Sequence, residues 1–183
     1  MNAAGHQGLA RFAHWVDQLN EGVGRAVSWL TVGMVVVTFT VVVLRYLFNM
    51  GWIAMQESVI YMHAAVFMLG AAYTLKNAGH VRVDLLYRSR NRRVQAWIDL
   101  WGSLLLLLPV CLFIGWISWE YIAASWAVKE TSQEAGGLPA VFLLKTIIPI
   151  MAALMVLQGI SQFLTNLLFL LREKSDVADE GCE

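Results

Sequence analysis

KNAGHVRVDLLYRSRNRR, residues 76–93, is a short basic segment between two long apolar runs. It holds six of the chain's 13 Lys and Arg residues and a single acid, Asp84. Short loops rich in Lys and Arg are retained on the cytoplasmic side of a membrane. The segment therefore predicts a cytoplasmic loop, and the apolar runs beside it predict membrane spans.

The composition agrees with a membrane location. Hydrophobic residues make up 58% of the 183 and charged residues 14%, and the apolar runs reach the roughly 20 residues that a helix needs to cross a bilayer. Because backbone polar groups cannot remain unpaired in lipid, the spans are expected to be helical. The fold class predicted is an all-α integral membrane protein. Its two cysteines, Cys111 and Cys182, are too few for a disulfide framework and are expected to be free thiols.

Four transmembrane helices are expected within a membrane domain of residues 26–171. The predicted spans are about 27–47, 53–75, 94–119 and 139–171. Pro109 and Pro149 are expected to kink the third and fourth spans, which neighbouring helices can tolerate. After residue 119 the aromatic stretch WEYIAASWAVKE is expected either to prolong the third helix or to turn along the outer surface.

Both ends of the chain are expected to be cytoplasmic. Residues 1–25 show no cleavable signal, and their apolar side chains recur every three or four residues, which predicts an amphipathic helix along the membrane surface. A frayed polar tail is the alternative for this segment. Residues 172–183 are acidic and predict a disordered tail. With this topology ten of the 13 basic residues are inside, and Arg45, Lys129 and Lys145 are outside.

The sequence contains no signature of catalysis or of a cofactor. A phosphate-binding loop, an HExxH motif and paired metal-binding cysteines are all absent. His63 is inside a predicted span, but His80 follows 17 residues later, roughly 25 Å along a helix axis, so one haem cannot bridge them. No enzyme activity, cofactor, metal or nucleic-acid partner is predicted. His63 is interpreted as a hydrogen-bonded helix-packing residue rather than a proton relay.

Three charged residues, Arg45, Glu57 and Lys145, are predicted near the outer boundary of the spans. Ionisable groups at membrane depth are rare without a partner. These residues could reach the interface, form an Arg45–Glu57 pair across the first hairpin, or pair with charges on another membrane subunit. The sequence leaves these alternatives open.

The fourth span carries a polar stripe on one helix face: Gln158, Ser161, Gln162, Thr165 and Asn166. Amide and hydroxyl groups that face lipid would remain unsatisfied. Gln158 and Gln162 are therefore predicted to face protein, either the other helices of the chain or a second chain.

Three segments together resemble a known family: RYLFNMGW (45–52), QESVIYMHAAVFMLGAAYTLKNAGHVRVDLLY (56–87) and ETSQEAGGLPAVFLLKTIIPIMAALMVLQGI (130–160). Their order and separation resemble the small, Q-type permease subunit of tripartite ATP-independent periplasmic (TRAP) transporters, over about residues 25–170. The resemblance implies a subunit of the bacterial inner membrane that supports a larger permease subunit. The resemblance implies that the larger subunit carries substrate and sodium, and that a periplasmic binding protein delivers the substrate, typically an organic acid.

The resemblance also suggests which residues meet the partners. The candidates for the interface with the large subunit are Arg45, Glu57, His63, Arg82, Asp84, Lys145, Gln158 and Gln162. Contact with the binding protein is expected at Trp126, Lys129, Glu130 and Glu134, for which an ordinary solvated loop is the alternative.

Two rival functions remain from the residues alone. One is a membrane anchor or electron-transfer subunit of a redox enzyme, which a haem absorption band would reveal. The other is a small multidrug exporter, although such proteins place a carboxylate mid-span and Glu57 is near a helix end.

Overall fold

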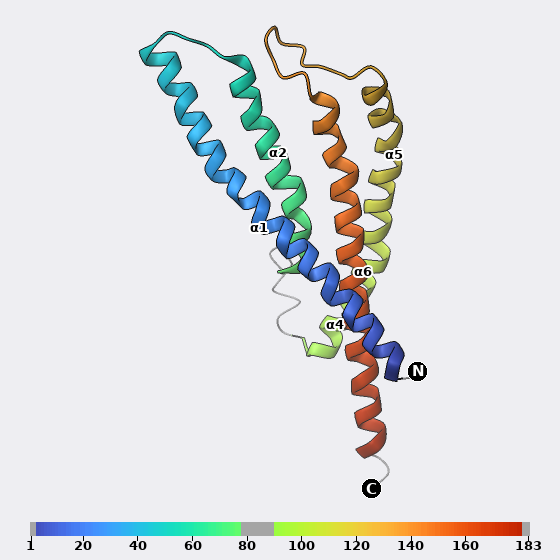
Figure 1. The fold of residues 1–183 in the computed structure, drawn as a ribbon. Helices are drawn as coiled ribbons and strands as arrows, with labels where there is room; N and C mark the ends of the chain where they lie inside the picture. The colour runs from blue at the N-terminus through green and yellow to red at the C-terminus, as the bar shows by residue number, and fades with distance from the viewer. Residues whose placement is uncertain (1–2, 78–89, 181–183) are drawn as a thin grey trace.

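The computed structural model describes the backbone of residues 3–77 and 90–180, and all regular secondary structure there is helical (Figure 1). The helices are α1 (Ala3–Leu47), α2 (Ile53–Lys76), α4 (Arg92–Gly102), a π-helical turn η1 (Ser103–Leu107), α5 (Leu108–Ala127) and α6 (Val141–Glu180). Over the described residues, four helical segments are long and apolar enough to cross a membrane: Gln7–Leu47, Ile53–Lys76, Arg92–Ala127 and Val141–Leu171. The predicted all-α class is confirmed, with four long apolar helices as candidate spans, and the orientation in the membrane stays a prediction.

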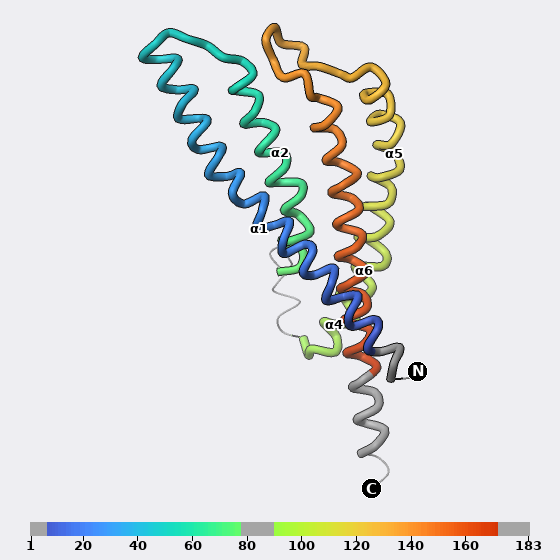
Figure 2. The backbone as a smooth tube through the Cα atoms, in the orientation of Figure 1, coloured from blue at the N-terminus to red at the C-terminus, as the bar shows by residue number. Residues whose placement is uncertain are grey.

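The helices form two hairpins, α1 with α2 and α5 with α6, and both α1 and α2 also pack on α6 (Figure 2). The chain ends and α4 lie at one end of the molecule, here called the terminal end. The connections 48–52 and 128–140 lie at the other, here called the hairpin end. Residues far apart in the sequence therefore meet at both ends.

Helix α1 is continuous from Ala3 to Leu47, without a break between the predicted segment 1–25 and the predicted span 27–47. Its 45 residues extend about 68 Å, far more than a ~30 Å hydrocarbon core requires. Gly24 allows α1 to cross α2 closely, because a Cβ atom there would lie 2.6 Å from the Tyr73 Cβ. The position of residues 1–25 along a membrane surface stays a prediction.

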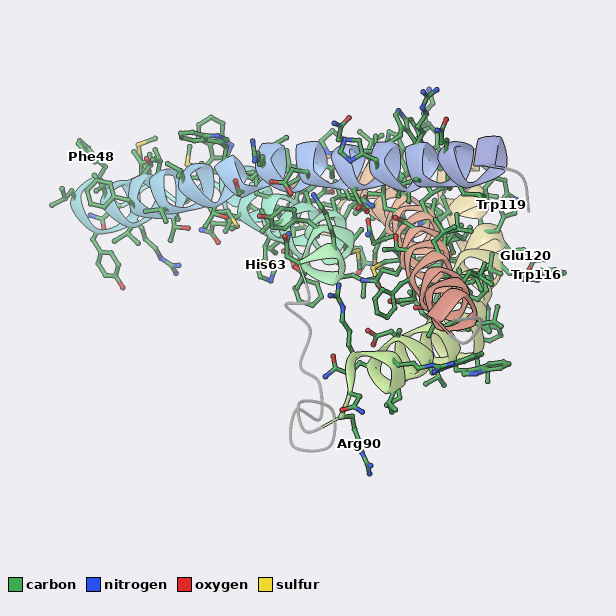
Figure 3. The ribbon with its side chains drawn as sticks, turned by 90° about the horizontal axis from the view of Figure 1, so that it is seen from below. Phe48, His63, Arg90, Trp116, Trp119 and Glu120 are labelled. Carbon is green, nitrogen blue, oxygen red and sulfur yellow. The ribbon has the colours of Figure 1, made fainter. Side chains whose placement is uncertain are left out.

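The third span bends before Pro109. The π-helical turn 103–107 ends two residues before this proline. Proline lacks an N–H group, and its ring would clash with the carbonyl four residues earlier in a regular helix. In Figure 3 α4 is seen side-on while α6 is seen nearly along its axis, so α4 lies across the terminal end. Beyond residue 119 the helix continues to Ala127, which is the first of the two expected alternatives.

Helix α6 begins at Val141, contains Pro149 and ends at Glu180. The expected disorder of residues 172–183 is thus replaced by helix as far as Glu180. The segment REKSDVADE contains neither glycine nor proline, so nothing in it terminates the helix before Gly181.

The interior contains mainly small side chains, while the large apolar side chains point outward. Ala13, Ala72, Ala96 and Ala152 are buried where helices meet, and Cys111 is a buried free thiol. In contrast, the side chain of Trp116 is 84% exposed. Such a surface is suited to contact with lipid or with another membrane protein.

Candidate interaction surfaces

A buried polar network joins the N-terminal half of α1 to α6 at the terminal end. Gln158 Nε2 donates a 2.9 Å hydrogen bond to Asp17 Oδ1, and Ser161 Oγ donates to the same oxygen at 3.0 Å. Asn20 Nδ2 donates to Gln158 Oε1 at 2.6 Å. The side chains of Asn20, Gln158 and Ser161 are each 1% exposed. Because buried polar groups are costly unless bonded, this network fixes the register of α1 on α6.

Asp17 and Asn20 were not predicted to contact other helices, because residues 1–25 were expected to lie along the membrane surface. The buried face of this segment contains Ala13, Val16, Asn20 and Gly24, whereas Phe12 is exposed. Small and polar residues at spacings of three and four are the signal that could have identified this face.

Gln158 and Gln162 of the polar stripe face protein, as predicted, and the protein is the same chain, whereas Thr165 of the stripe is exposed. Gln158 belongs to the network above, and Gln162 Nε2 donates to the Leu75 carbonyl of α2 at 3.0 Å. Leu75 is in the last turn of α2, where carbonyl groups run out of intrahelical donors. The amide of Gln162 therefore ties the end of α2 to α6.

Ion pairs connect the first hairpin at the same end. The Lys76 ammonium lies 2.8 Å from a carboxylate oxygen of Glu21, whose other oxygen lies 2.9 Å from Arg25. Lys76 is thus held by α1. Arg82 and Asp84, the two interface candidates from the same basic segment, lie outside the described residues.

Glu57 holds the long connection 128–140 at the hairpin end. Its carboxylate accepts hydrogen bonds from Ser132 Oγ and, at 2.7 Å, from the Leu138 backbone N–H. Gly137 leaves room for this contact, since a Cβ atom there would lie 2.6 Å from Ser132 Cβ and 2.8 Å from Glu57 Oε2. The alternative of an Arg45–Glu57 pair is wrong: among the described residues Glu57 bonds to this connection, and Arg45 is exposed at the end of α1.

Lys145 is also bonded within the chain. Its ammonium pairs with the Glu130 carboxylate and lies 3.9 Å from the centroid of the Tyr121 ring. Ser125 Oγ donates a further 2.7 Å hydrogen bond to Glu130. The bonds from Lys145 and then Ser125 hold the pKa of Glu130 below its ordinary value of 4.5.

Two of the four candidates for binding-protein contact thus have intramolecular roles. Glu130 pairs with Lys145, and Trp126 Nε1 donates to Thr146 Oγ1 at 2.9 Å while its ring packs edge-on against Phe142. Lys129 and Glu134 are exposed on the same connection. Lys129 has a backbone φ of 46°, a left-handed conformation that few side chains adopt, so the connection has a defined shape here.

His63 is exposed near the middle of α2, which differs from the helix-packing role expected for it. Its ring stacks on that of Phe67 with centroids 6.3 Å apart, and Figure 3 shows the side chain directed away from α1. Ile60 and Phe67, on the same face, are 60% and 73% exposed. The packed face of α2 is occupied by small residues such as Ala72, which leaves the imidazole outside.

Within the described residues no group of three or more His, Cys, Asp or Glu side chains is placed to hold a metal ion. The carboxylates at both ends instead accept hydrogen bonds that join helices and connections. This arrangement of polar groups stabilises a scaffold.

The family model described as "Tripartite ATP-independent periplasmic transporters, DctQ component" matches residues 34–169. The chain belongs to this family. DctQ proteins are non-enzymatic transporter components, and the family is one of bacterial multi-pass membrane proteins. The resemblance seen in the sequence is thereby confirmed, and membership of this family takes the place of the two rival functions, a redox-enzyme anchor and a multidrug exporter.

A curated relative is the C4-dicarboxylate TRAP transporter small permease protein DctQ of Vibrio cholerae serotype O1 (strain ATCC 39315 / El Tor Inaba N16961). It is 28% identical over 116 residues, which cover 62% of this DctQ chain and 47% of the relative. The chain thus matches about half the length of that relative. No solved structure matches the chain.

Proposed function

We propose that this DctQ chain braces the large permease subunit of a TRAP transporter in the bacterial inner membrane. In this proposal the assembled transporter takes up an organic acid, coupled to sodium and supplied by a periplasmic binding protein. The proposal rests on the contrast between the two ends of the molecule, where polar networks join the helices, and the apolar sides of the spans, which are largely exposed. In the most apolar stretch of each span only 6–22% of residues are buried, although polar networks hold the helices at both ends.

The terminal end is proposed to be cytoplasmic. Its described basic residues include Arg11, Arg25, Lys76, Arg90 and Arg92, and cytoplasmic loops carry an excess of such residues. The hairpin end, with Glu57 and the connection 128–140, is then periplasmic.

The face of α2 formed by Ile60, His63 and Phe67 is proposed to contact the large subunit. These residues have i, i+3 and i+7 spacing, so they lie on one side of the helix. An imidazole directed into acyl chains would leave polar nitrogens unsatisfied, which is costly in lipid. A partner helix that bonds His63 removes this cost.

The connection 128–140 is proposed to present Lys129 and Glu134 to the binding protein. Glu57 binds the connection through the Leu138 N–H group, and Glu130 anchors it to Lys145. The exposed charges of the connection are therefore held in fixed positions. A docking surface that is already ordered avoids the entropic cost of ordering it on binding.

The test is reconstitution with purified components. The large subunit is reconstituted into sodium-free vesicles with and without this chain, the binding protein is added outside, and uptake of labelled dicarboxylates and sugar acids is measured with and without sodium in the external buffer. Saturable, sodium-driven uptake that requires the chain supports the proposal. If the chain alone catalysed saturable accumulation, or if the large subunit neither co-purified with it nor needed it, the brace would be excluded.

A further inference from the structure

Helix α4 has a partly exposed aromatic face. Ala96 and Leu100 on one side are buried against Leu170 of α6. The other side exposes four large apolar residues: Val94, Trp97, Ile98 and Trp101. The rings of Trp97 and Trp101 stack with their centroids 6.5 Å apart and are 46% and 49% exposed.

The bend at residues 103–107 orients this face. Because α4 lies across the terminal end rather than along the spans, its axis runs roughly parallel to the expected membrane plane (Figure 3). Exposed tryptophans on a helix with this orientation are typical of the boundary between acyl chains and headgroups.

Positive charge lies at the start of the helix, one to two turns before Trp97. Arg90 is exposed, and Figure 3 shows its side chain extending away from the bundle. Arg92 is also exposed, with its guanidinium 4.8 Å from the centroid of the Phe169 ring, which positions it beside α6. The first turn of α4 contains no acidic residue to neutralise them.

We propose that α4, with Trp97 and Trp101 on its exposed face and Arg90 and Arg92 at its start, binds an anionic phospholipid. The guanidinium groups bind the headgroup phosphate of a lipid of the phosphatidylglycerol type, and the stacked indoles lie against its glycerol and upper acyl region. Charge complementarity selects the lipid, because a zwitterionic headgroup brings its own cation to the arginines. The inference requires a membrane location and does not depend on the proposed partner surfaces.

The chain provides its own control in a second exposed tryptophan pair. Trp116 and Trp119 line a hollow on α5 together with Gly115 and Glu120, and Figure 3 shows these side chains pointing away from α6. The neighbouring charge here is negative, since Glu120 is exposed. Rings of the same kind beside a carboxylate have no electrostatic preference for an anionic headgroup.

The experiment measures tryptophan fluorescence of the full-length chain in nanodiscs containing a small fraction of lipid with brominated acyl chains. Brominated phosphatidylglycerol is compared with brominated phosphatidylcholine, and the contribution of each pair is obtained by difference from W97F/W101F and from W116F/W119F. The α4 pair is expected to be quenched several-fold more strongly by phosphatidylglycerol, and this excess is expected to shrink at high salt. The α5 pair is expected to be quenched equally by both lipids.

Two arginine variants decide the outcome. R90Q/R92Q is expected to abolish the excess quenching, and R90K/R92K, which keeps the charge, to retain most of it. Equal quenching of the α4 pair by both lipids, or an excess that persists in R90Q/R92Q, would overturn the proposal. The same measurement on the chain with its large subunit tests a protein occupant: loss of quenching by both lipids there would assign the face to that subunit instead.

Discussion

The two ends of the molecule use carboxylates in different ways. At the terminal end Asp17 accepts bonds from the neutral donors Gln158 and Ser161, between helices that cross each other. At the hairpin end Glu57 and Glu130 bind a connecting segment, through a hydroxyl, a backbone N–H and the Lys145 ammonium. The terminal end therefore fixes how helices pack, and the hairpin end fixes the shape of a surface.

Removing Gln158 should have the largest effect, because it breaks the terminal network at its centre. Gln158→Leu leaves the Asn20 amide without its acceptor and removes one donor from Asp17. Leaving a buried polar group unsatisfied costs about 1–3 kcal/mol, so unfolding in detergent should occur at a clearly lower temperature or denaturant concentration. The matched control is Gln162→Leu, which loses one bond to a carbonyl and should destabilise less. Equal loss in both variants would contradict the central role of Gln158.

Releasing the connection at the hairpin end should have a smaller effect on overall stability. Glu57→Ala removes the acceptor of the Ser132 and Leu138 bonds, which hold the connection rather than the packing of the helices. Limited proteolysis within residues 128–140 should accelerate while the thermal midpoint changes little. Gly137→Ala should act similarly, since its added Cβ would crowd both partners of the Ser132–Glu57 hydrogen bond. Unchanged cleavage in both variants would remove Glu57 from this role.

Lowering the pH should weaken the Glu130–Lys145 pair at the hairpin end. The pKa of Glu130 is lowered in the folded chain, so its pair with Lys145 contributes stability above the ordinary value of 4.5 and loses it as pH falls through the lowered pKa. Hydrogen exchange in residues 125–135, corrected for the intrinsic pH dependence of exchange, should show decreasing protection below about pH 4.5. In Glu130→Gln that part of the pH dependence should be absent. A wild-type profile identical to that of Glu130→Gln would contradict the assignment.

The smallest effect on the isolated chain is expected away from both ends, at His63. Because the side chain is exposed, His63→Ala should change the free energy of unfolding by less than about 0.5 kcal/mol. Co-purification with the large subunit should nevertheless weaken. The control is Val36→Ala, an exposed apolar position on α1 that should leave assembly unchanged. Normal assembly of His63→Ala would move the interface elsewhere.

The sequence by itself determined the membrane class, the four helices and the protein-facing side of Gln158 and Gln162. These features depend on local hydropathy and on the 3.6-residue helical period, which a sequence displays directly. The partners of the polar groups were decided only by the tertiary structure. Gln158 meets Asp17 across 141 positions, and Glu57 meets Leu138 across 81.

The features that the sequence did not predict have the same physical cause. His63 was expected to pack and is exposed, because helix periodicity shows which residues share a face but not which face the neighbouring helix covers. The orientation of α4 follows from the π-helical turn before Pro109, whose direction depends on packing against α6. Periodicity and hydropathy are properties of one helix, whereas hydrogen-bond partners and exposed faces are properties of several helices packed together, so only the assembled fold decides them.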